Sequence, residues 1–189
     1  MKKVLSIVLS LVMVLAALPM TAIESSATDY YTSQDGEWVY YLDPDNGYAI
    51  IYNNANKAYL GTDANVTVPS VIDGHTVVSL GQYSFKACTT LESIVIPSTV
   101  ETIANHVFYD CTNLASVSIN GNIGGIAQYT FYNCQSLNHV TLPNSCTSIG
   151  YGSFQYCYSL SDITLPNNLT TIGTYAFKLF GCNVIGIIQ

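Results

Sequence analysis

A period of 23 residues runs through most of this 189-residue chain and constrains its fold more than any other feature. Five phenylalanines, four cysteines and four leucines recur at that spacing: Phe85, Phe108, Phe131, Phe154 and Phe177; Cys88, Cys111, Cys134 and Cys157; Leu91, Leu114, Leu137 and Leu160. Four further columns hold Ile, Val or Leu at the same period, with Cys146 as the one cysteine among them. Such a repeat predicts a solenoid, because each unit buries its apolar side only by stacking on its neighbours.

Each unit has the pattern of a short strand, a turn and a second extended piece. In the first of these strands Ile94 and Ile96 alternate with outward-facing neighbours, and Pro97 ends the strand because it has no amide hydrogen to donate. Ile103 then supplies a second buried position before the chain returns to Phe108. No segment is long enough for a regular helix of several turns. The sequence therefore predicts a mainly β solenoid of about five coils with short parallel strands.

The repeated motif also resembles a known family. Phe-x-x-Cys-x-x-Leu-x-x-Ile-x-Ile-Pro, followed by an Ile-Gly pair, is similar to the BspA-like (Treponema-type) leucine-rich repeat, and residues 160–177 are its cleanest copy. The resemblance covers about residues 66–182. It implies a leucine-rich-repeat solenoid in a bacterial protein that is secreted or displayed on the cell surface. Some members resemble adhesins that bind host proteins, so the resemblance implies recognition rather than catalysis.

The N-terminal segment predicts export. Two lysines precede the apolar run Val4–Leu18, and Ser25-Ser26-Ala27 offers small residues for cleavage, as in a secretory signal peptide spanning residues 1–27. The alternative is a membrane anchor, but the 15 apolar residues are fewer than the roughly 20 that a bilayer span needs. No later run is apolar enough to span a membrane, so we expect no membrane span after cleavage.

The rest of the chain divides into a cap and the repeats. Residues 28–65 lack the period, and within them Trp38–Leu42 and Tyr48–Tyr52 flank a Pro and Asn-Gly turn, which predicts an N-terminal β-hairpin cap. Residues 66–189 form the predicted solenoid, whose last coil is incomplete. An apolar edge strand at Val184–Ile188 indicates either edge-to-edge self-association or a truncated copy of a longer protein.

Composition excludes several classes of protein. Only 9% of residues are charged, the net charge is −7, and all five basic residues are lysines. Nucleic-acid binding needs basic side chains to neutralise phosphates, so no nucleic acid is expected as a partner. Hydrophobic residues make up 49% of the chain, which excludes intrinsic disorder.

Two sets of side chains are candidate binding residues. The first faces outward from the predicted strands and consists of Ser93, Val95, Ser116, Ser118, His139, Thr141, Asp162 and Thr164. The second gathers near the Phe-to-Cys turn and consists of Tyr83, Tyr109, Tyr129, Tyr132, Tyr156, Tyr158 and Tyr175. Solenoid sheets commonly bind partners, and tyrosine is favoured at interfaces and on sugars. The alternatives are strand formers that merely face water and tyrosines that only pack the turns.

The potentially reactive residues show no catalytic pattern. Neighbouring cysteines of the column are close enough for disulfides, but stacked parallel side chains do not point at each other, so free buried thiols are favoured. His75, His106 and His139 have no partner at a spacing that would suggest catalysis or a metal site. We expect no enzyme activity, no cofactor and no metal.

Together these features predict a secreted, non-catalytic scaffold that recognises an extracellular protein or glycan at the cell surface or host interface. The alternative is a structural fragment of a longer surface repeat protein without binding activity of its own.

Overall fold

The structure, a computed structural model, describes residues 29–53, 57–161 and 163–178. Throughout these residues the regular elements are strands joined by turns, and the strands of successive coils pair in parallel. The predicted mainly β solenoid with an N-terminal hairpin cap is therefore confirmed. The predicted signal peptide at 1–27, Cys182, the incomplete last coil and the edge strand Val184–Ile188 lie outside the described residues.

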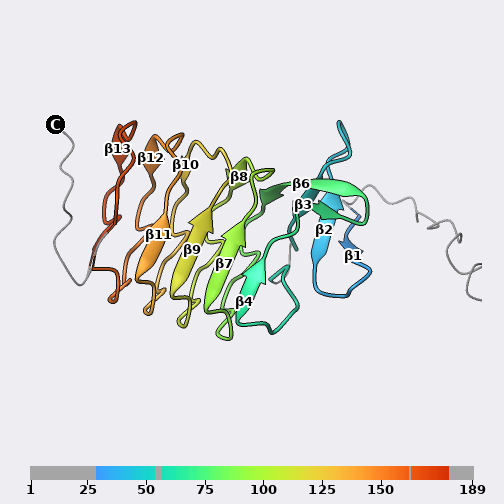
Figure 1. The fold of residues 1–189 in the computed structure, drawn as a ribbon, viewed down its shortest axis with the longest axis horizontal. Coiled ribbons are helices and arrows are strands. Elements are labelled where there is room, and N and C mark those ends of the chain that lie inside the picture. The colour runs from blue at the N-terminus through green and yellow to red at the C-terminus, as the bar shows by residue number, and fades with distance from the viewer. Residues whose placement is uncertain (1–28, 54–56, 162, 179–189) are drawn as a thin grey trace, which may run out of the picture.

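One side of the solenoid is a parallel sheet of four strands. In spatial order these are β4 (Asn65–Thr67), β7 (Ser93–Ile96), β9 (Ser116–Ile119) and β11 (His139–Thr141), which lie side by side in Figure 1. The register joins residues 23 apart between β7, β9 and β11, and 28 apart between β4 and β7, because the first repeat is longer. Alternate residues of these strands point inward and are buried; Ile94 and Val117, for example, are each 1% exposed.

A second series of short strands runs along the solenoid. It begins with β6 (His75–Leu80), which pairs with β8 (Thr102–Ile103), and continues as a separate sheet of β10 (Gly125–Ile126), β12 (Ser148–Ile149) and β13 (Thr171–Ile172). These strands follow one another along one edge of the ribbon in Figure 1. Directly after β13 a glycine is needed, since a Cβ on Gly173 would lie 2.6 Å from the Tyr151 nitrogen.

The turn around each phenylalanine adds a third ladder, which the sequence pattern did not predict. Backbone N–H groups of alternate residues donate to carbonyls of the next coil over 2.8–3.1 Å, as from Phe108 to Thr130 and from Asp110 to Tyr132. The residues two before and two after each phenylalanine adopt left-handed backbone conformations, which turn these amides toward the next coil: Tyr83, Ala87, His106, Asp110, Tyr129, Asn133, Gly152, Tyr156 and Tyr175. Each non-glycine residue there costs roughly 1 kcal/mol or more, which the ladder offsets.

Stacked phenylalanines form the centre of the core. The rings of Phe85, Phe108, Phe131, Phe154 and Phe177 follow one another at centroid distances of 5.1–5.4 Å. The first four are fully buried, while Phe177 in the last described coil is partly buried. All described hydrophobic core residues belong to one continuous cluster, as expected if each coil is stabilised by its neighbours.

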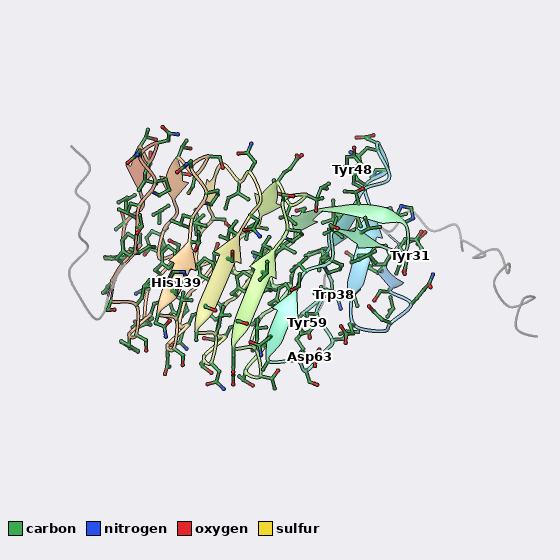
Figure 2. The ribbon with its side chains drawn as sticks, in the orientation of Figure 1. Tyr31, Trp38, Tyr48, Tyr59, Asp63 and His139 are labelled. Carbon is green, nitrogen blue, oxygen red and sulfur yellow. The ribbon has the colours of Figure 1, made fainter. Side chains whose placement is uncertain are left out.

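The cap extends both the sheet and the ring stack. Strands β1 (Tyr31–Thr32), β2 (Val39–Leu42) and β3 (Ala49–Ile51) are antiparallel, and β3 then pairs in parallel with β6, whose start also carries β5 (Val71–Ile72). Trp38 and Tyr59 lie against each other (Figure 2), 4.8 Å apart, and Tyr59 lies 5.3 Å from Phe85. The cap thus covers the first open end of the phenylalanine stack with aromatic rings.

The fifth coil departs from the expected strand pattern. Residues 163–165 are not assigned to a strand, although Ile163 is buried as its column requires. A groove of about 260 Å³ opens beside β11, between His139, Thr141 and the segment 164–167. The strand ladder therefore ends at β11 within the described residues. Asp162, a predicted binding residue, lies outside them.

Candidate binding surfaces

The outward side chains of the four-stranded sheet β4-β7-β9-β11 form two rows, here called the strand face. Register pairs place Asn65, Ser93, Ser116 and His139 in one row and Thr67, Val95, Ser118 and Thr141 in the other. His139, labelled on β11 in Figure 2, is exposed, as are Thr141 and Val95, whereas Ser93, Ser116 and Ser118 are half-buried. The strands thus bring six of the eight predicted outward residues together, and Thr164 borders the groove beside them.

Asn65 and Thr67 belong to this face but were not among the residues predicted from sequence. Asn65 accepts a 2.6 Å hydrogen bond from the Ser93 hydroxyl, which ties β4 to the first full coil. The 23-residue period does not identify them, because the first repeat is longer and they precede their partners on β7 by 28 residues. The match of Val68-Pro69 to Ile96-Pro97 is the signal that could have found them.

A line of aromatic rings crosses the coils at the phenylalanine turn and is here called the tyrosine ridge. It consists of Tyr83, His106, Tyr129, Tyr151 and Tyr175, with successive ring centroids 5.0, 5.1, 5.2 and 5.4 Å apart. Tyr151 was not predicted, because the column of Tyr83 and Tyr129 holds a glycine, Gly152, in this coil. The ring of the preceding residue, Tyr151, takes the position in the ridge instead. A Cβ on residue 152 would lie 2.7 Å from the Tyr129 ring, so glycine allows this ring to approach the backbone.

A second line of side chains runs beside the first, with Tyr109 and Tyr132 three residues after His106 and Tyr129. Tyr109 and Tyr132 stack at 4.7 Å with nearly parallel rings, and Tyr156 meets Tyr132 edge-on at 5.2 Å. Between the two lines is a groove of about 480 Å³, the tyrosine groove, lined by His106, Tyr109, Tyr129, Tyr132, Tyr151, Gln155, Tyr175 and Lys178. Four of the predicted tyrosines thus line one groove; Tyr83, Tyr156 and Tyr158 lie outside it.

Two lysines stand at the ends of this aromatic surface. The Lys86 ammonium lies 5.0 Å from the centre of the Tyr83 ring, and the Lys178 ammonium lies 4.7 Å from that of Tyr175. Burial, with the Lys86 charge as a smaller cause, lowers the pKa of His106, so this histidine is neutral near pH 7. Its Nδ1 is buried without a hydrogen-bond partner. The positive charge among the groove-lining side chains therefore comes from Lys178.

The thiols and histidines have structural contacts. Cys111, Cys134 and Cys157 each donate a hydrogen bond of 2.9–3.1 Å to the carbonyl of the phenylalanine one coil earlier, as from Cys134 to Phe108. The five described cysteines are free and buried, in agreement with the favoured prediction. His75 contacts the Gly47 carbonyl at 3.0 Å and His139 the Thr141 hydroxyl at 3.3 Å. Across the described residues no three His, Cys, Asp or Glu side chains are grouped as metal ligands.

Burial predicts slow reaction of these thiols with a water-soluble reagent. In a Cys182→Ser variant, which leaves only the described cysteines, we expect modification of the native protein at pH 8 to be at least ~100-fold slower than in urea. Burial raises the pKa of Cys134 and Cys157, which lowers the thiolate fraction further. Ellman's reagent measures both rates. Rapid modification of the native protein, or fewer than five thiols after unfolding, would contradict free buried cysteines.

The described residues include no helix with the length and apolarity of a membrane span.

A search of curated protein sequences gives no match. Solved structures do match. The leucine rich repeat protein of T. pallidum is 33% identical, with a TM-score of 0.66 over 78% of this chain and 67% of that one.

Two further bacterial structures are similar. A leucine-rich repeat protein from Bacteroides ovatus is 26% identical with a TM-score of 0.63, and the match covers 87% of this chain but 41% of that protein. A leucine rich cell surface protein from Faecalibacterium prausnitzii is 26% identical with a TM-score of 0.54, over 85% of this chain and 55% of that one. The BspA type leucine rich repeat region matches residues 65–187 in six copies. The chain therefore belongs to the BspA-type leucine-rich repeat family.

Proposed function

We propose that this protein is exported and acts outside the cell, or on its surface, as a non-catalytic scaffold that recognises a protein partner through the strand face. In this proposal residues 1–27 are a signal peptide, 28–65 the cap and 66–189 the repeat region. The Faecalibacterium relative described as a cell surface protein supports the location. Repeat proteins of this family are generally interaction scaffolds, which supports the assignment of a binding role.

The observation that carries the proposal is the contrast between the inward and outward residues of strands β7, β9 and β11. Inward residues such as Ile94 and Val117 are fully buried and repeat with little change. Outward residues in the same strands differ in kind from coil to coil, from Val95 to Ser118 to Thr141, although the backbone holds them in one register. A rigid core with a row of differing surface side chains can be matched to a partner without altering the fold.

The strand face suits a protein partner because its two rows of side chains include no Asp, Glu, Lys or Arg. Val95 is 36% exposed at the centre of the sheet and offers an apolar contact, while the surrounding hydroxyl and amide groups can form hydrogen bonds. Interfaces commonly combine an apolar centre with a polar rim. The chain's net charge of −7 is not concentrated here, so shape and hydrogen bonds would give specificity.

The proposal is tested by replacing the exposed apolar residue of the strand face with a charged one. The purified protein is applied to an array of immobilised extracellular-matrix and serum proteins, and the signals are compared with those of Val95→Lys. We expect the variant to lose at least about tenfold in affinity for any bound protein, because a lysine would be desolvated at the contact.

Asn122→Lys is the matched control, because Asn122 is also exposed but lies in the turn after β9. It adds the same charge and should leave binding unchanged. Equal effects of the two substitutions would contradict recognition through the strand face, and so would the absence of binding to any protein on the array.

A further inference from the structure

The tyrosine groove has the features of a second binding site, on a different segment of the coil from the strand face. Among the residues that the structure describes, its lining combines aromatic rings, a buried amide and a cation, and includes no carboxylate. We propose that this groove binds an acidic polysaccharide, a chain of pyranose rings that bear carboxylates. The inference depends on the proposed function only in placing the protein outside the cell, and it does not require the strand face to bind.

The tyrosine ridge presents one ring per coil, which suits a polymer more than a compact ligand. Its rings repeat every 5.0–5.4 Å along the solenoid, so a chain lying across the coils meets a similar contact at each step. Tyr151 stands edge-on to both Tyr129 and Tyr175, which turns its ring relative to theirs. The C–H groups of a pyranose face carry partial positive charge and are attracted to the negative face of an aromatic ring.

The groove also supplies groups that could orient sugar hydroxyls. Gln155 is 8% exposed, yet its side chain is among those lining the groove. Gly152 makes room beside it, because a Cβ there would lie 3.1 Å from the Gln155 amide oxygen and closer still to the Tyr129 ring. Tyrosine hydroxyls and the His106 imidazole add further donors and acceptors around the same space. A few polar groups among rings are typical of sites that fix a ligand's orientation.

Charge selects an acidic sugar over a neutral one. The described lysines are Lys57, Lys86 and Lys178, and two of these three lie on terminal rings of the tyrosine ridge. In a protein with a net charge of −7, cations at both ends of one aromatic surface attract an anion there. The nearby Asp110 carboxylate accepts a 2.8 Å hydrogen bond from Asn133 and is not part of the groove lining. An acidic peptide would match the lysines but lacks the flat C–H faces that match the rings.

Isothermal titration calorimetry with three polymers tests the match of charge and ring. Oligomers of galacturonic acid carry both features, dextran oligomers carry only the sugar ring, and polyglutamate carries only the carboxylate. We expect the galacturonate oligomer to bind at least about tenfold more tightly than either of the others at low salt, and to weaken as salt rises. Equal binding of polyglutamate would overturn the sugar component, and equal binding of dextran would overturn the charge component. No binding of galacturonate would overturn the proposal.

Two substitutions test whether binding occurs in this groove. Tyr175→Ala should weaken galacturonate binding about threefold to tenfold through the lost ring, and Lys178→Gln about threefold through the lost charge. Tyr158→Ala and Lys57→Gln are the matched controls, because Tyr158 is 51% exposed, much like Tyr175 at 48%, and neither control residue lines the groove. Controls that weaken binding as much as the groove variants would overturn the location.

Lys178→Gln keeps the test valid if Tyr175→Ala unfolds the last described coil, because a surface charge contributes little to stability. Val95→Lys, the strand-face variant, should bind galacturonate as the unmodified protein does. If Val95→Lys abolishes protein binding and galacturonate does not bind at all, only the glycan proposal fails. If galacturonate binds and no protein does, only the strand-face proposal fails.

Discussion

Replacing Phe131 by alanine is expected to lower the free energy of unfolding by about 3–5 kcal/mol, because it removes a fully buried ring and leaves a cavity. Phe131 is stacked between Phe108 at 5.3 Å and Phe154 at 5.1 Å, so the loss affects the contacts of three coils. Urea denaturation followed by circular dichroism measures the effect. Because coils are stabilised by their neighbours, the variant should also show a broader or split transition.

Phe131→Leu is the matched control for this substitution. Leucine keeps an apolar side chain in the stack and should cost less than half as much as alanine. If Phe131→Ala lowered the free energy of unfolding by less than about 1 kcal/mol, the phenylalanine stack would not be the centre of the core. Equal losses for leucine and alanine would instead indicate that ring stacking itself carries the stability.

Alkaline pH is expected to destabilise the protein strongly. Burial raises the pKa of Cys157 from its ordinary value of 9.0 to about 12, and burial likewise raises the pKa of Cys134. A thiol with a raised pKa in the folded state stabilises that state below its unfolded pKa. This stabilisation is lost as the pH rises through the folded pKa, since the unfolded chain releases its protons first.

The loss should therefore begin near pH 9 and continue toward pH 12. Cys157 alone corresponds to about 4 kcal/mol when the shift is fully expressed. Burial also raises the pKa of Tyr132 to about 12, which adds in the same direction. The neighbouring Cys111 thiol lowers the pKa of Cys88, whereas burial raises the pKa of Cys111, so the pair does not reverse the direction of the loss.

Urea denaturation at a series of pH values from 7 to 11 measures the dependence. Cys157→Ala is the control, because it removes one buried thiol and should flatten the curve while lowering stability at pH 7. A free energy of unfolding that stays constant up to pH 11 would contradict the burial of the cysteine column. A curve of unchanged slope in Cys157→Ala would show that other groups cause the dependence.

Much of the core could be predicted because the 23-residue period fixes which residues point inward. Every described member of the phenylalanine, cysteine and leucine columns except Phe177 is buried. Phe177 stands in the last described coil and is partly buried. The outward strand residues followed from the same alternation. Their neighbours Asn65 and Thr67 did not, because the first repeat is longer and their partners come 28 residues later.

The turn could not be predicted in the same way. Bulky residues such as Tyr83 and Tyr129 rarely adopt left-handed backbone conformations, so sequence alone argued against them. Tertiary hydrogen bonds between coils favour that conformation, and Gly152, Asp110 and Asn133 were the clearest local signals. Tyr151 was missed for a related reason, since its ring fills a gap that arises one residue away, at Gly152.

We propose that the protein recognises its partner through the strand face. The most direct test places a photoreactive amino acid at position 118, on the strand face. The control places the same amino acid at position 147, because Thr147 is exposed but lies beside β12. Irradiation of cells that display the protein should give a discrete cross-linked species from position 118 and none from position 147. Equal cross-linking at the two positions, or none at position 118, would contradict the claim.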